Sequence, residues 1–213
     1  MKPYRIRALN MGETRVPSAE VYWMTKLTGW DPLTFWSLLI ENDDRRILLN
    51  TGFAQDHSAL HQHWTTWAKS AMGEEGHVPV VKPENWIVNA LARHSLTPDQ
   101  IDHVVITPMT AYATGGLDQF KKAQIWFSRT GWIDFHAPDP EVPQLPRHIV
   151  FPPHILTWLV TEAASRLHFL PDEETEILPG LKSWFCGAHH RSSVVVLIQT
   201  EAGPVAATDA VFT

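Results

Sequence analysis

The sequence is poor in cysteine, in basic clusters and in long apolar runs, and each shortage excludes a class of protein. Its 213 residues include one cysteine, Cys186, so no disulfide framework can form within the chain. Lysine and arginine are scattered and the net charge is -6, which argues against a nucleic-acid partner. No apolar stretch approaches the roughly 20 residues of a membrane helix, and residues 1–5 lack the apolar run of a signal peptide. We therefore expect a soluble, cytoplasmic protein with neither a nucleic-acid nor a membrane partner.

Apolar residues, by contrast, are abundant enough to bury a core. They make up 44% of the chain against 19% charged residues, which suits a single domain over residues 1–213. Tryptophan is unusually frequent, with ten residues spread along the chain. Packing inside the domain is the first explanation, because large aromatic side chains dominate core burial. The alternative is that some tryptophans line an apolar pocket or an interface between subunits.

Short patterns along the chain predict early and late strands with helices between them. A hairpin is expected from the strands 34–41 and 45–50, which flank the turn residues 42–44. The other strands are expected at 5–9, 103–107, 123–128, 181–185, 193–200 and 204–207. Helices are expected at 58–71, 84–94 and 157–166. The proline-rich segment 138–153 is expected to be a loop or edge segment with a short strand at 148–151. This order indicates mixed sheets covered by helices.

Several stretches, in order, resemble the metallo-β-lactamase superfamily, and most of all its lactonase-type hydrolases. Leu48–Phe53 (LLNTGF) resembles the early strand that usually reads Leu-Val/Ile-Asp-Thr-Gly. Residues 96–107 resemble the lead-in to the metal loop, and residues 115–120 resemble the Gly-Gly-Leu segment after it. Residues 178–189 resemble the approach to a later metal histidine, and residues 206–211 resemble the strand ending in a bridging aspartate. The resemblance spans about residues 34–213.

This resemblance implies an α/β fold, a four-layer αββα sandwich with the active site along one edge of its two sheets. Catalysis in the family needs two metal ions, usually zinc. They are held by a His-any-His-any-Asp-His loop, a later histidine, a bridging aspartate and a final histidine. Because four residues follow Asp209, the closing C-terminal elements and the final histidine are expected to be missing.

The loop that should bind metal carries other residues here. The family pattern would place histidine at positions 108 and 110, aspartate at 112 and histidine at 113. This chain has Pro108, Thr110, Tyr112 and Ala113, none of which is a good zinc ligand. Asn50 also stands where the early strand usually has aspartate. We therefore predict no bound metal and no cofactor.

His189 and Asp209 match the later histidine and the bridging aspartate. Two ligands alone cannot hold zinc tightly, so a residual hydrogen-bonded pair is the first interpretation. The alternative is one weak metal site completed by a residue from elsewhere. His190 is expected to point away from it, because neighbouring side chains alternate on an extended backbone.

A second group of histidines lies at His57, His61 and His63. A helix would put His57 and His61 on one face, since they are four residues apart. No carboxylate or cysteine completes a metal pattern there, so surface histidines are expected. Cys186 has no obvious base beside it, which indicates a structural thiol.

These observations favour a non-catalytic relative of the hydrolases. It would bind a small molecule or serve as a subunit of a larger assembly, either a homodimer or a complex with a related subunit. Trp126 and Trp132 are expected near that contact. The predicted pocket consists of Asn50, Thr107, Pro108, Thr110, Tyr112, His189 and Asp209.

The alternative is an active hydrolase of lactones or esters with a single-metal or metal-free site. Thr110, Tyr112, His189 and Asp209 would then supply the acid and base groups. Zinc lowers the pKa of its bound water from about 15.7 to about 7. A metal-free site forfeits that activation, so the non-catalytic interpretation is preferred.

Overall fold

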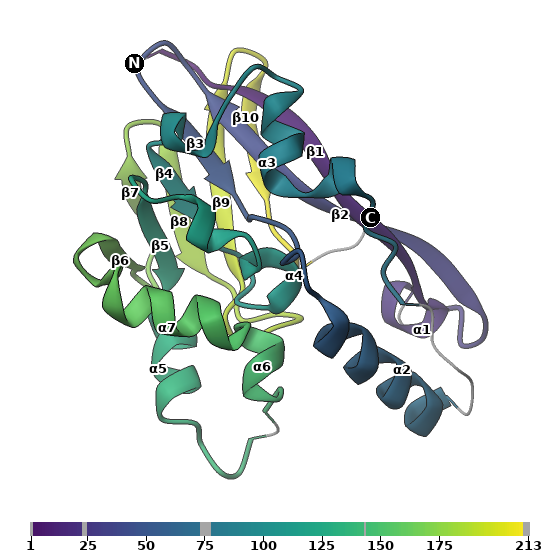
Figure 1. Ribbon diagram of the computed structural model, residues 1–213. Helices are drawn as coiled ribbons and strands as arrows, with labels where there is room; N and C mark the ends of the chain where they lie inside the picture. Colours follow the sequence, from purple (N-terminus) through teal and green to yellow (C-terminus); the bar gives the residue numbers. More distant parts are fainter. Residues whose placement is uncertain (1, 23–24, 73–77, 143, 211–213) are drawn as a thin grey trace.

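The chain folds into two β-sheets that pack face to face. The computed structural model describes residues 2–22, 25–72, 78–142 and 144–210 (Figure 1). The six-stranded sheet runs in the order β1 (Arg5–Pro17), β2 (Trp30–Glu41), β3 (Arg46–Leu49), β4 (His103–Val105), β5 (Gln124–Ser128) and β6 (Leu167–Leu170). The four-stranded sheet runs in the order β10 (Gly203–Ala207), β9 (Val194–Thr200), β8 (Leu181–Phe185) and β7 (Thr175–Leu178).

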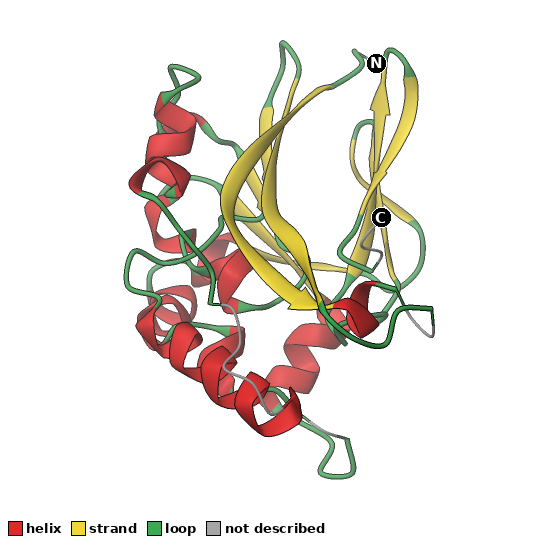
Figure 2. Cartoon of the chain, turned by 90° about the vertical axis from the view of Figure 1, so that its right-hand side faces the viewer, coloured by secondary structure: helices red, strands yellow, loops and turns green. Residues whose placement is uncertain are grey.

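Helices cover the outer face of the six-stranded sheet (Figure 2). They are α2 (Ser58–Met72), α3 (Ile87–Ala92), α4 (Ala111–Thr114), α5 (Arg129–His136), α6 (Arg147–Val150) and α7 (Pro153–Thr161). The short α1 (Ser18–Val21) lies apart from them, between β1 and β2 at the end of their hairpin. Short 3-10 turns lie at Pro83–Asn85, Pro98–Gln100, Leu117–Gln119 and Ala164–Arg166. The α/β class and the packed sheets are confirmed, and the described residues form no helical layer over the outer face of the four-stranded sheet. Within the same residues, no helix is long and apolar enough to cross a membrane.

Two apolar cores hold these layers together. One lies between the helices and the six-stranded sheet, where Leu91 and Ile155 meet Val104 and Phe127. The other lies between the sheets, where Val105 packs in one cluster with Val196 and Ile198. Successive side chains of a strand point to opposite faces, so Val104 and Val105 enter different cores. Because both faces of this strand are buried, its sequence is a continuous apolar run.

The strand directions gather four loops at one edge of the sandwich. β3, β4, β5 and β6 run parallel, so their carboxyl ends share an edge. The loops after β3 and β4 meet the β8–β9 loop and the residues after β10 there, because Asp209 is hydrogen-bonded to both Thr107 and Ser193. In α/β sheets such an edge is the usual position of a ligand site.

Local structure departs from the sequence prediction in places where short polar signals dominate. β1 does not end at Leu9: the turn-like Asn10 and Gly12 form a register shift inside a long hairpin, with Asn10 Oδ1 accepting from Gly12 N at 2.8 Å. The strand predicted at 148–151 is wrong, because α6 occupies it after Pro146. Prolines at first helical positions also begin α7 earlier than predicted, at Pro153.

Other elements were shifted or missed. The helix predicted over 84–94 divides into a 3-10 turn and α3, because Trp86 between them is extended. α5 was not predicted; the Ser128 hydroxyl caps it by accepting from Gly131 N at 3.0 Å. β6 and β7, of four residues each, were too short to show a pattern.

Candidate functional site

Asp209 lies at the centre of the site, where the two sheets meet. The Thr107 hydroxyl donates to Asp209 Oδ1 at 3.1 Å, and the Ser193 hydroxyl donates to Oδ2 at 2.9 Å. Both hydroxyls are buried, with Thr107 1% exposed and Ser193 fully enclosed. The carboxylate therefore has a hydrogen bond on each oxygen, one from the loop after β4 and one from the start of β9. Thr107 and Asp209, both named in the predicted pocket, are thus joined by a hydrogen bond.

Asn50 fixes the loop after β4 from the neighbouring strand end. Its Nδ2 donates to Thr107 O at 2.6 Å, and its Oδ1 accepts from Thr107 N at 2.9 Å. A side-chain amide can donate to the carbonyl of Thr107 and also accept from its N–H, whereas a carboxylate can only accept. Asn50 has φ 65°, a left-handed conformation that asparagine tolerates better than most residues. Asn50 is thus a structural clamp on the backbone of Thr107.

We expect Asn50→Asp to lower the free energy of unfolding by about 1–3 kcal/mol, because the Thr107 carbonyl loses its donor and faces a negative charge. Urea unfolding at neutral pH measures this change. Asn89→Asp, on the exposed face of α3, is the matched control and should have a much smaller effect. Equal losses in the two variants would show that the clamp contributes nothing particular.

The loop after β4 is packed tightly and presents few donors. Pro108 is buried and follows a cis peptide bond, while Thr110 and Ala113 are each 1% exposed. Thr110 precedes α4, and the Ala113 carbonyl accepts from both Thr51 N at 2.8 Å and Thr51 Oγ1 at 2.9 Å. The loop is therefore anchored to the end of β3 through its backbone.

Tyr112 is the loop residue that reaches the histidines. Its ring centroid lies 5.1 Å from that of Phe35 and 6.3 Å from that of Trp64. Its hydroxyl is 2.9 Å from His190 Nε2. Burial, aided by the negative charge of Asp209, raises the pKa of Tyr112 far above its ordinary value. The phenol therefore stays protonated at physiological pH.

His190 points into the site, and the prediction that it points away is wrong. His189 and His190 lie in the loop between β8 and β9, where His189 has φ 65°. This left-handed residue breaks the alternation of an extended chain, and the two imidazole centroids are 4.1 Å apart. Non-glycine residues adopt this conformation uncommonly, so the sequence carried no signal for it.

The two histidines and Asp209 form a compact group. His189, His190 and Asp209 each offer a ligand atom within 4.8 Å of the others. His189 Nδ1 lies 3.0 Å from the Asp209 carbonyl oxygen and 3.5 Å from Oδ2. Burial and the neighbouring His189 lower the pKa of His190 to about 4, so His190 is neutral at physiological pH.

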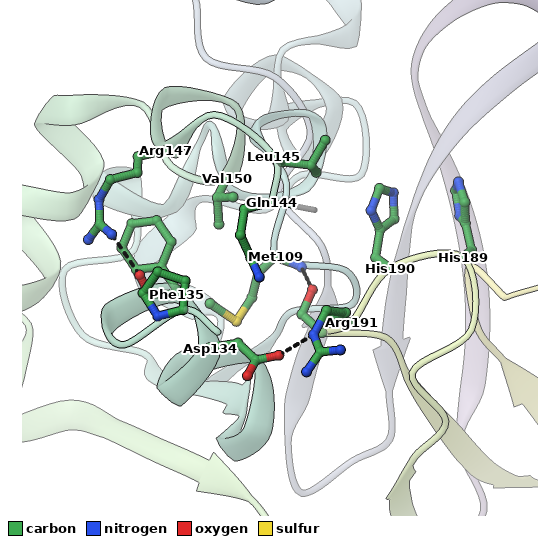
Figure 3. A pocket seen from close by; sticks show the side chains of 13 residues that line it. Met109, Asp134, Phe135, Gln144, Leu145, Arg147, Val150, His189, His190 and Arg191 are labelled. Atoms are coloured by element: carbon green, nitrogen blue, oxygen red, sulfur yellow. Dashed lines mark hydrogen bonds and ion pairs between the residues drawn. The ribbon is translucent and has the colours of Figure 1, made fainter. Parts of the chain in front are cut away.

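A cleft of about 290 Å³ opens beside this group (Figure 3). Arg191 forms an ion pair with Asp134 at 2.5 Å. Arg147 donates to the Phe135 carbonyl at 2.8 Å, and its guanidinium group lies over the aromatic ring of Phe135. The apolar lining residues are Met109, Phe135, Pro138, Leu145 and Val150, and the polar ones include Gln144, His189 and His190. The cleft thus combines an apolar wall with cationic groups, which suits an amphiphilic molecule.

The second histidine group lies apart from this site. The His57 and His61 imidazoles are 4.5 Å apart, although His57 directly precedes α2, which begins at Ser58; the His63 and His148 ring centroids are 6.3 Å apart. His57 lines a smaller cleft of about 170 Å³ beside α6 and α7. No group of three metal donors forms there among the described residues.

Trp126 and Trp132, expected near a subunit contact, are both half-buried. Trp126 stacks on His168 at 4.4 Å and Trp132 on Phe127 at 5.6 Å. Association through them stays a prediction. Cys186 is half-buried, and its Sγ lies 3.4 Å from Ser193 O.

Comparison with known proteins identifies the architecture. No family model and no curated protein match the sequence. A solved N-acyl homoserine lactone hydrolase, with N-hexanoyl-L-homoserine at its catalytic metal centre, matches 97% of this chain and 75% of its own, with TM-score 0.72 and 19% identity. A protein of Thermotoga maritima assigned to the metallo-β-lactamases matches with TM-score 0.53 and 14% identity, over 96% of this chain and 77% of its own. The chain has the metallo-β-lactamase fold.

A further metallo-β-lactamase-fold structure adds to this finding. A variant of AiiA from B. thuringiensis, with N-decanoyl-L-homoserine at its active site, gives TM-score 0.72 at 20% identity and covers 97% of this chain and 75% of its own. The predicted fold is confirmed, and at these identities the likeness concerns the fold alone.

The metallo-β-lactamase fold implies a metal centre, which the donor set allows us to test. Among the described residues, one group of three donors is found, and none of them comes from residues 108–113. Three donors suit one ion that keeps an open position, and they are too few for two ions. The residues present therefore fit a single ion and do not fit a two-metal centre.

Proposed function

We propose that this protein is a non-catalytic homologue of the lactonases that binds a small amphiphilic molecule in the cleft beside His190. The observation that carries the proposal is the loop after β4, where Pro108, Thr110, Tyr112 and Ala113 provide neither imidazole nor carboxylate. Hydrolysis of a lactone needs an activated water, and two-metal enzymes obtain it from the metal ions. The cleft supports binding, because it keeps an apolar wall and cationic groups.

The site residues can orient a ligand without carrying out chemistry on it. Arg191 pairs with Asp134 through Nε, so its other guanidinium N–H groups can donate to an anionic or carbonyl oxygen. The apolar wall of Phe135, Leu145 and Val150 would take the hydrocarbon part. Asp209 has a structural role, because its carboxylate joins the loop after β4 to the residue before β9 by accepting hydrogen bonds from Thr107 and Ser193.

We expect well under one zinc per chain after mild dialysis and no turnover of N-hexanoyl homoserine lactone above the buffer rate. Elemental analysis and a pH-indicator assay of lactone opening measure the two quantities. A lactonase of the same fold, purified in parallel, controls for zinc loss during dialysis. Two tightly held zinc ions per chain, or turnover at enzymatic rates, would overturn the proposal.

A second function, hydrolysis of lactones or esters at a single-metal or metal-free site, is favoured by the grouping of His189, His190 and Asp209. The assay with chelator distinguishes its forms. Turnover that survives chelator and disappears in His189→Ala supports metal-free chemistry. Turnover that appears only with added zinc supports a single ion.

A further inference from the structure

All three potential metal donors are already engaged with protein groups. His190 Nε2 meets the Tyr112 hydroxyl at 2.9 Å, and His189 Nδ1 meets the Asp209 carbonyl at 3.0 Å. The two Asp209 carboxylate oxygens accept hydrogen bonds from Thr107 and Ser193. An ion entering this group must displace or rearrange some of these contacts. The contact of His190 differs from that of His189, because a hydroxyl can donate to the ring nitrogen, whereas a carbonyl oxygen can only accept from it.

Tyr112 is held in place independently of His190. It lies on α4, directly before Ala113, whose carbonyl is anchored to Thr51, and Thr114 N donates to Thr110 O at 2.9 Å within the same turn. Its ring packs against both Phe35 and Trp64, which also stack on each other at 5.8 Å, so the three rings form one aromatic cluster. The hydroxyl is thereby presented to His190 by a rigid support.

The hydrogen bond between Tyr112 and His190 determines whether His190 can bind a metal ion. A neutral imidazole carries hydrogen on one nitrogen and a lone pair on the other, and only the lone pair can bind a metal. When the protonated phenol donates to Nε2, the ring hydrogen must be on Nδ1. Neither nitrogen of His190 then has a free lone pair.

We propose that Tyr112 is a lock on a single divalent-cation site formed by His189, His190 and Asp209. The lock withholds the His190 lone pair and leaves two donors, which hold an ion weakly. Replacing the phenol by a phenyl ring removes the donor and retains the packing against Phe35 and Trp64. The site should then bind one ion through three protein ligands. This inference goes beyond the proposed function and does not depend on what the cleft binds.

The test is a Co²⁺ titration of the full chain, followed by the visible absorption of four-coordinate cobalt, with Zn²⁺ calorimetry alongside. Tyr112→Phe should bind one ion about tenfold more tightly than the natural sequence, as expected for the loss of one competing hydrogen bond. Tyr22→Phe is the matched control, because Tyr22 is exposed, and it should leave the affinity unchanged. Adding His190→Ala to Tyr112→Phe should abolish the gain.

A second measurement uses the unsubstituted chain and needs no variant to fold. Long-range ¹H–¹⁵N NMR spectra report which nitrogen of His190 carries hydrogen, and Nδ1–H is expected. An Nε2–H tautomer would overturn the proposal, because Tyr112 would then accept from His190 and support metal binding. Unchanged or weaker affinity in Tyr112→Phe, or a gain that persists without His190, would also overturn it. Lactone turnover by the natural sequence would contradict the proposed function and leave this affinity ratio untouched.

Discussion

Replacing Gly115 by alanine is expected to lower the free energy of unfolding by more than about 4 kcal/mol, enough to unfold much of the protein. An added Cβ would lie 2.0 Å from Ala54 N and 2.4 Å from Phe53 C. Both are backbone atoms, which cannot turn aside as a flexible side chain can. Gly115 has φ -64°, an ordinary value for any residue, so the requirement for glycine is one of space alone.

The contact at Gly115 is where the loop after β4 joins the loop after β3. Gly115 N donates to Gly52 O at 2.9 Å, which brings the two backbones together. Any side chain at 115 must separate these loops and move the residues that surround Asp209. We therefore expect the loss of stability to be accompanied by loss of any binding in the cleft.

Gly203→Ala is the control that separates steric overlap from backbone strain. Gly203 has φ 113°, which alanine adopts with difficulty, but beyond its two chain neighbours no heavy atom of the described residues lies within 4 Å of its added Cβ. A cost of about 1–3 kcal/mol is expected there. Urea unfolding followed by circular dichroism measures both variants. A cost at Gly115 no greater than that at Gly203 would show that the two loops can move apart easily.

A chain with Pro108→His, Thr110→His, Tyr112→Asp and Ala113→His is expected to become dependent on zinc for its stability. The new imidazoles at 110 and 113 enter filled space, because Thr110 and Ala113 are each 1% exposed. Overpacking costs about 1–3 kcal/mol at each position, so the metal-free variant should melt well below the natural sequence. Zinc at a thousand times its Kd would raise the free energy of unfolding of this variant by about 4 kcal/mol, which corresponds to a rise in Tm of about 10 °C.

Thermal unfolding with zinc and with chelator measures this dependence. The matched control is Pro108→Gln, Thr110→Gln, Tyr112→Asn and Ala113→Gln, which adds comparable volume with poor zinc ligands. It should melt early in both conditions. If zinc leaves the Tm of the histidine variant unchanged, the loop does not aim these positions at His189 and Asp209.

The sequence was sufficient to predict the fold, because the fold depends on patterns that survive substitution. The strand 181–185 was predicted with the observed bounds, and the stretches around Thr51, Gly115 and Asp209 retained the order of the family. Elements such as α6 were mispredicted because a proline at a helix start resembles a proline in a loop.

The sequence placed Asn50, Thr107 and Asp209 in one pocket, and the structure joins them by hydrogen bonds. That they belong to a functional site stays a prediction. His190 was missed because its direction follows from the left-handed backbone of His189, which sequence periodicity does not show. The absence of bound metal remains a prediction, since it depends on affinities and not on residue positions.

The hydrogen bond between Thr107 and Asp209 spans 102 positions of the chain, and that between Met109 and Ser192 spans 83. Contacts so distant in sequence form slowly, because the intervening chain loses conformational entropy before the contacts contribute any stabilisation. During synthesis the N-terminal part emerges first. The six-stranded sheet can therefore assemble while its inner face, including Ile47 and Val105, still awaits the second sheet. The cleft takes its described form only when the loop between β8 and β9, which supplies His189, His190 and Arg191 to its lining, has docked against the first sheet.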